Sequence, residues 1–146
     1  MKRRAVLKGI GAGAMLPAMG GLRALAQAAA VQPGDTAVFE LREYHAAEGK
    51  LDDLLARFRD HTIPIFNRLH MESIAYWTPT DDPLKGRTLI YILKHPSREA
   101  ATESWAAFRD DPEWKRVSAA SEANGKLTEK VDSTFMVLTD FSARIG

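Results

Sequence analysis

The chain has 146 residues and no cysteine, and its twenty Lys and Arg nearly balance its nineteen Asp and Glu. Without cysteine, a disulfide framework and a thiolate metal site are both excluded. Five of the basic residues precede Asp35, the first acidic residue, so the rest of the chain carries a net charge of about −4. That part has no clustered basic run, and nucleic acid is therefore not an expected partner.

Residues 1–30 have the pattern of a cleavable signal peptide. A basic start is followed by a mildly apolar stretch from Gly9 to Gly21, and then by small residues that suit signal peptidase. The apolar stretch is shorter than the roughly 20 residues that a membrane span requires, so a permanent membrane anchor is not expected. Residues 31–36, which contain Pro33-Gly34, are expected to be a linker.

The basic start resembles the twin-arginine export signal. The residues that match this pattern are Arg3, Arg4, Leu7 and Lys8, whereas Val6 stands where the pattern has Phe. The alternative is an ordinary Sec signal that happens to contain two arginines. The twin-arginine interpretation implies that the translocase recognises Arg3 and Arg4 and that the protein reaches the periplasm or the cell exterior already folded.

Hydrophobic periodicity and turn residues predict one domain, at residues 37–142, with the element order β-α-β-β-α-β. The expected elements are a strand at 38–45, a helix at 50–70, strands at 74–78 and 89–95, helices at 98–110 and 112–123, and a strand at 131–139. This order is that of the ferredoxin-like split βαβ plan. We therefore expect an α+β domain whose four-stranded antiparallel sheet has helices on one face.

Three residues mark expected features of the helices. Pro64 falls inside the first helix, where it removes one backbone hydrogen bond and should bend the axis. Ser97 and Asp111 precede the later helices and are expected to cap them. The last helix should stop at Asn124-Gly125.

The first strand alternates between apolar and polar residues. Alternation places Phe39 and Leu41 on one face and Glu40, Arg42 and Tyr44 on the other. We expect the apolar face to pack under the helices. The polar face should then point to the opposite side, toward water or a semi-polar lumen.

Several short segments resemble the NIPSNAP family of the dimeric α+β barrel superfamily, over nearly the whole chain after the signal. They are Glu40-Leu41-Arg42-Glu43-Tyr44, Gly49-Lys50-Leu51, His61-x-x-Pro64, Tyr76-Trp77 and Asp111-Pro112-Glu113-Trp114. One departure is His70-Met71, where the family often has Gly near the end of the first helix. The resemblance implies a homodimer in which two sheets face each other and close a barrel.

The polar face of the first strand is the main candidate ligand site. Glu40 would act as an acid or base, Arg42 as an anion clamp, and Tyr44 as a phenol within reach of both. Tyr76 and Trp77 are neighbours on a strand, so one of them should face the same lumen. The alternative is that Glu40 and Arg42 form a structural ion pair at the dimer interface.

Histidines give weaker candidates. His61 borders the apolar stripe of the first helix and is a candidate proton shuttle or haem ligand, or else a packing or capping residue. No His-x-x-x-His spacing occurs, so no metal site is predicted.

Three functions are compatible with these features. The first is an exported homodimer that binds a small hydrophobic or aromatic molecule, with no cofactor predicted. The second is a cofactor-independent monooxygenase or a haem-modifying enzyme that uses His61 or His45 together with Tyr44 and a tryptophan of the lumen, with Glu40 as a further catalytic candidate. The third is a purely structural dimer. No recognisable catalytic motif separates them.

Overall fold

The computed structural model describes residues 37–145, which include the whole predicted domain. The predicted signal peptide and linker, residues 1–36, lie outside the described residues. None of the helices in the described part of the chain is long and apolar enough to cross a membrane.

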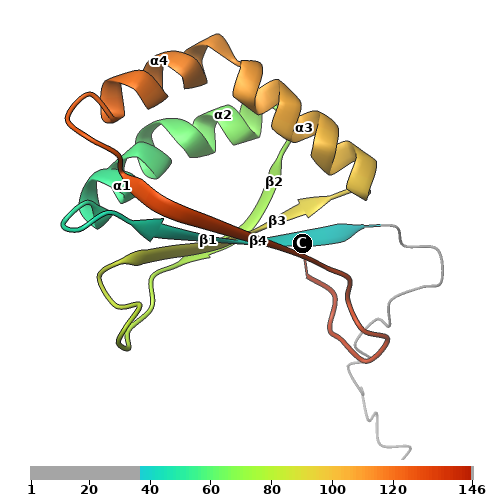
Figure 1. Cartoon of the computed structure of the whole chain (residues 1–146). Helices are drawn as coiled ribbons and strands as arrows, with labels where there is room; N and C mark the ends of the chain where they lie inside the picture. Colours follow the sequence, from blue (N-terminus) through green and yellow to red (C-terminus); the bar gives the residue numbers. More distant parts are fainter. Residues whose placement is uncertain (1–36, 146) are drawn as a thin grey trace, which may run out of the picture.

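Four strands form a single antiparallel sheet in the order β2-β3-β1-β4 (Figure 1). The strands are β1 (Val38–Ala46), β2 (Glu72–Trp77), β3 (Thr88–His95) and β4 (Thr128–Met136). The helices cover one face of the sheet and leave the other face without a helix (Figure 1). The predicted α+β class and element order are confirmed.

Five helical segments make up the second layer. They are α1 (Leu51–Arg57), η1 (Phe58–Thr62), α2 (Ile63–Arg68), α3 (Arg98–Asp110) and α4 (Pro112–Ser121). The cap predictions are confirmed, because Ser97 Oγ accepts from the backbone N–H of Ala100 and Asp111 Oδ1 accepts from that of Trp114. These bonds satisfy backbone donors that a helix start otherwise leaves unpaired.

The predicted first helix is continuous but contains one π-helical turn. In that turn, η1, the backbone N–H of Ile63 bonds to the carbonyl of Phe58, five residues earlier. Pro64 follows directly, at the start of α2. A proline in a regular helix clashes with the carbonyl four residues before it, and the wider π turn gives this carbonyl more room. The helix thus accommodates the proline through a π turn.

The turn between α2 and β2 has a left-handed residue. His70 has a φ of 56°, in the left-handed region. The backbone N–H of His70 bonds to the carbonyl of Asn67 as the helix ends. A side chain in this conformation is unfavourable, whereas glycine adopts it freely. The turn therefore holds a histidine in a conformation that glycine would adopt at lower cost.

The prediction for the two faces of β1 is wrong. Glu40 accepts a hydrogen bond from Trp105 of α3, and the ring of Tyr44 packs on Phe58 of η1 at 5.3 Å. The polar face therefore packs under the helices. Leu41 lies on the opposite face, which carries no helix, and pairs there with Ile92 of β3. The prediction failed because it assumed that the helices cover the apolar face of β1, whereas Glu40 and Tyr44 have partners on the helices.

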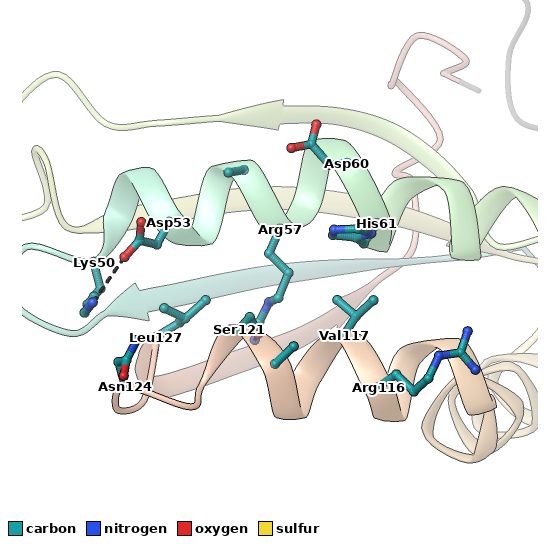
Figure 2. A pocket seen from close by; sticks show the side chains of 12 residues that line it. Lys50, Asp53, Arg57, Asp60, His61, Arg116, Val117, Ser121, Asn124 and Leu127 are labelled. Atoms are coloured by element: carbon teal, nitrogen blue, oxygen red, sulfur yellow. Dashed lines mark hydrogen bonds and ion pairs between the residues drawn. The ribbon is translucent and has the colours of Figure 1, made fainter.

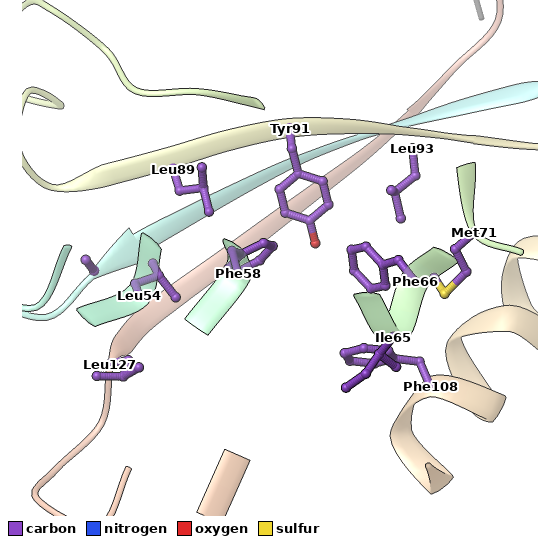
Figure 3. Packing of buried hydrophobic residues seen from close by; sticks show 11 residues of the cluster. Leu54, Phe58, Ile65, Phe66, Met71, Leu89, Tyr91, Leu93, Phe108 and Leu127 are labelled. Carbon is purple, nitrogen blue, oxygen red and sulfur yellow. The ribbon is translucent and has the colours of Figure 1, made fainter. Parts of the chain in front are cut away.

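The hydrophobic core lies between the sheet and the helices (Figure 3). Tyr91 of β3 is fully buried at its centre, and its ring lies within 6.2 Å of four other rings. These are the rings of Tyr44, Phe58, Phe66 and Tyr76. Offset and edge-on ring pairs of this kind stabilise a core beyond the area they bury. The aromatic packing fixes the position of β1 against η1 and α2.

Candidate functional site

A buried carboxylate is the centre of the candidate site. Glu40 on β1 is only 1% exposed. Its Oε1 accepts from Arg42 Nη1 at 2.9 Å and from Ser133 Oγ at 2.7 Å. Its Oε2 accepts from Trp105 Nε1 at 2.6 Å and lies 3.1 Å from His95 Nε2. An ionised carboxylate only accepts, so His95 donates from Nε2 in this contact.

The sheet register explains why these donors meet. Glu40 pairs with Leu93 of β3 and with Phe135 of β4. His95 and Ser133 are each two residues from those partners, so their side chains point to the same face as Glu40. Trp105 reaches the carboxylate from α3, above this face. Four separate elements thus supply the donors.

The hydrogen bonds keep Glu40 ionised. Burial raises the pKa of Glu40, but the donors from His95, Trp105, Ser133 and Arg42 lower it from 4.5 to about 2. The carboxylate therefore carries its charge throughout the neutral range. A group with this pKa and with four filled hydrogen bonds orients its donors and is poorly suited to proton transfer near pH 7.

Arg42 is held between Glu40 and two aromatic side chains. Its guanidinium lies 4.3 Å from the ring centre of Trp105 and donates from Nη2 to the hydroxyl of Tyr44 at 3.1 Å. Burial lowers the pKa of Arg42, but Tyr44, Tyr91 and Glu40 raise it by more than burial lowers it. The pKa of Arg42 is therefore above its ordinary value. The side chain is a fixed cation whose charge is balanced by Glu40.

These side chains border a cavity of about 470 Å³ between β1, β4 and α3. We call it the α3 cavity. It is lined by Glu40, Arg42, Tyr44, Arg98, Thr102, Trp105, Phe108, Arg109, Trp114, Ser133 and Phe135. Its size lies within the range of small-molecule sites, which are largely apolar with a few fixed polar groups.

The structure brings together three of the five predicted ligand-binding residues. Glu40, Arg42 and Tyr44 line the α3 cavity, whereas the other two are elsewhere. Tyr76 faces the core and stacks on Tyr91 at 5.3 Å. Trp77 is 47% exposed on the opposite face of the sheet. Alternation separates the two as expected, but neither lines the cavity.

His61 lies apart from this site. It is exposed on η1, which corrects the expectation that it borders the buried stripe. It lines a different cavity, of about 600 Å³, between η1 and α4 (Figure 2). In Figure 2 the side chain of Arg57 crosses this space toward Ser121, to which it donates at 3.3 Å. A set that joins His61 to Glu40 and Tyr44 is therefore not formed.

His45 also fails to join the predicted catalytic set. Its Nε2 lies 3.0 Å from Asp132 Oδ2 of β4. This contact is on the sheet face without helices, because His45 and Tyr44 are neighbours on β1 and point to opposite sides. Among residues 37–145, no group of three or more His, Asp or Glu is arranged to hold a metal ion.

The sequence interpretation missed the contribution of α3. Arg98, Thr102, Trp105 and Arg109 all line the α3 cavity. Their spacings of four, three and four residues place them on one face of a helix. That spacing was a usable signal. The parts played by His95 and Ser133 carried no such signal, because they depend on the register of β3 and β4 with β1.

Three solved structures with the same architecture are from bacteria. An uncharacterised NIPSNAP-like domain protein from Burkholderia xenovorans aligns with a TM-score of 0.67 and 16% identity, over 77% of this chain and 93% of its own. A NIPSNAP family protein from Agrobacterium tumefaciens gives a TM-score of 0.64 and 23% identity, over 73% and 96%. A further Agrobacterium tumefaciens protein of the family, of unknown function, gives 0.64 and 20%, over 75% and 95%.

At such identities the structural likeness shows the fold alone. No curated protein is significantly similar to the chain. The sequence itself carries the assignment, because a model of the NIPSNAP family matches residues 39–143, from the second residue of β1 to beyond β4. The chain belongs to the NIPSNAP family.

Proposed function

We propose that this protein is exported, forms a homodimer and binds a small hydrophobic or aromatic molecule in the α3 cavity. The observation that carries the proposal is the fixed Glu40, Arg42 and Trp105 cluster on the wall of a cavity of about 470 Å³. The ligand site therefore lies between the sheet and α3 in each protomer. It is separate from any space that two sheets enclose.

The chemistry of the walls supports an aromatic ligand. Five of the lining residues are aromatic, namely Tyr44, Trp105, Phe108, Trp114 and Phe135. Trp105 cannot rotate freely, because its indole N–H donates a hydrogen bond to Glu40 and the guanidinium of Arg42 stacks on its ring. A wall that is already ordered loses little conformational entropy when a ligand binds.

The electrostatics favour binding over acid–base catalysis. Glu40 has a pKa of about 2, so it neither donates a proton near pH 7 nor accepts one readily. Its neighbours Arg42 and Ser133 are both engaged as donors to it. The cluster supports a role in shape and charge recognition, which needs no proton transfer.

The face without helices supports the homodimer. Leu41, Ile90 and Ile92 lie on this face, together with the exposed indole of Trp77. A contiguous apolar patch of this kind is typical of an interaction surface. Association through this face would leave both α3 cavities on the outer sides of the two sheets.

Export is proposed from the sequence, since Arg3 and Arg4 lie outside the described residues. If the twin-arginine translocase recognises this pair, replacing both by Lys will keep the protein in the cytoplasm in folded form. Cell fractionation of an epitope-tagged chain measures this. Unchanged export of the double variant would assign the signal to the Sec route.

Ligand binding is tested by native mass spectrometry of protein purified from the exporting cells. We expect an added small-molecule mass in the wild type and its loss in Phe135→Ala, which removes one aromatic wall. Trp77→Ala is the matched control, because Trp77 lies on the other face. An empty cavity that also fails to bind added aromatic compounds contradicts the proposal, and a haem absorption band would favour the haem-modifying enzyme.

A further inference from the structure

The charges of the α3 cavity are unbalanced. Glu40 and Arg42 neutralise each other across 2.9 Å, and the other two charged lining residues, Arg98 and Arg109, are both cations. The chain beyond the expected signal peptide is nevertheless acidic overall. The cavity is therefore a positive region on an acidic protein, and such a region attracts anions.

The two arginines are not consumed by ion pairs of the fold. Within residues 37–145, no Asp or Glu oxygen lies within 4.0 Å of the Arg98 or Arg109 guanidinium. By contrast, Arg57 and Arg68 each reach a carboxylate. Guanidinium N–H groups without a carboxylate partner remain free to bind an anionic group of a ligand.

The position of Arg98 is also informative. Its guanidinium carbon lies 3.4 Å from the ring centre of Phe135, so the cation is stacked on the aromatic wall of the cavity. A stacked guanidinium presents its N–H edge to a ligand. Arg98 is also the first residue of α3, where the helix dipole disfavours a cation. A bound anion would relieve that unfavourable placement.

Arg98 and Arg109 flank the aromatic part of the cavity. They are eleven residues apart on one face of α3, which corresponds to about 16 Å along the helix axis. Trp105 lies between them, held by Glu40. An aromatic ligand ring that packs against Trp105 would thus have Arg98 toward one end of α3 and Arg109 toward the other.

We propose that the α3 cavity selects aromatic anions, with Arg98 and Arg109 as the residues that recognise the anionic group. This inference rests on the proposed ligand-binding function and adds the charge of the ligand. Arg42 is not the anion clamp expected from the sequence, because Glu40 already balances it. The ring of the ligand packs on the aromatic wall, and its carboxylate meets a guanidinium.

A matched ligand pair tests the charge preference. Isothermal titration of the wild type with 2-naphthoate and with 2-naphthalenemethanol compares an anion with a neutral molecule of similar size. We expect the anion to bind at least about tenfold more tightly in about 20 mM salt. The preference should shrink in about 0.5 M salt, because the arginines are exposed and ions screen them.

Paired arginine variants test the assignment of residues. In Arg98→Gln with Arg109→Gln, we expect the preference for the anion to disappear while the neutral molecule binds as before. Arg59→Gln with Arg116→Gln makes the same change of charge outside the α3 cavity and should keep the preference. Equal affinity of the two molecules for the wild type, or an unchanged preference in Arg98→Gln with Arg109→Gln, overturns this inference alone. Failure of both molecules to bind the wild type contradicts the ligand-binding proposal itself.

Discussion

The indole nitrogen of Trp105 donates a 2.6 Å hydrogen bond to Glu40 Oε2 and so ties α3 to β1 across 65 positions of the sequence. The guanidinium of Arg42 stacks on the face of the same indole. One tryptophan therefore contacts both members of an ion pair whose carboxylate is buried.

Loss of Arg42 should destabilise the domain strongly. Arg42→Ala leaves the buried carboxylate of Glu40 without its cation, and we expect the free energy of unfolding to fall by about 3 kcal/mol. Adding Glu40→Gln removes the unpaired charge and should recover part of the loss. Urea denaturation at neutral pH measures all three proteins. A loss below about 1 kcal/mol for Arg42→Ala would place the pair among ordinary surface ion pairs.

Acid should weaken the domain through Glu40. The pKa of Glu40 is about 2 in the folded protein against 4.5 for an ordinary glutamate, so ionised Glu40 stabilises the fold above about pH 4.5. This stabilisation, about 3 kcal/mol, is lost as the pH falls from 4.5 toward 2.

The measurement is the free energy of unfolding of the wild type and of Glu40→Gln across this range. Asp111 also has a pKa of about 2, because Arg68 donates to it, so both proteins should lose some stability in acid. The wild type should lose more, and the two curves should converge at low pH. Parallel curves for the two proteins would contradict the role assigned to Glu40.

The left-handed turn offers a stabilising substitution. His70→Gly relieves the unfavourable φ of 56°, and we expect a gain of about 0.5 to 1 kcal/mol, seen as a higher Tm. Asn67→Gly is the control, because Asn67 lies in α2, where glycine should cost about 1 kcal/mol. A lower Tm for His70→Gly would show that the imidazole contributes more than the strain costs.

The face without helices should control assembly. We expect Ile92→Lys to shift the protein to a monomer, because it places a charge in the centre of the apolar patch. Ala119→Lys, on the exposed side of α4, should leave the mass unchanged. Light scattering at micromolar protein concentration distinguishes the two. A wild type that is already monomeric would remove the homodimer from the proposal and leave the α3 cavity unaffected.

Local patterns predicted the elements of this fold well. The cap residues Ser97 and Asp111 depend on short-range chemistry, and both are found in the structure. The last helix ends at Ser121, a few residues before the predicted stop at Asn124-Gly125. The order of the elements also predicted the four-stranded antiparallel sheet, because it is the order of the split βαβ plan. Boundaries shifted by a few residues, as for β4, which starts at Thr128 and not at Val131.

The orientation of the sheet was not predictable from alternation alone. Alternation divides β1 into two faces but does not say which one meets the helices. β3 is apolar on both faces and gave no further guidance. The polar face of β1 can be buried because Glu40 receives donors from β3, β4 and α3, and those partners are remote in sequence. Whether a buried carboxylate finds its hydrogen-bond donors is a property of the tertiary structure.

The outer strands of the sheet have a consequence for behaviour at high concentration. β2 is short and carries a bulge between Ser73 and Ala75. β4, at the other edge, displays charged side chains, among them Lys130 and Asp132, which form an ion pair at 2.8 Å. Irregular and charged edges oppose the addition of further strands from neighbouring molecules. Two copies can meet through their sheet faces, but these edges disfavour open-ended polymerisation into fibres.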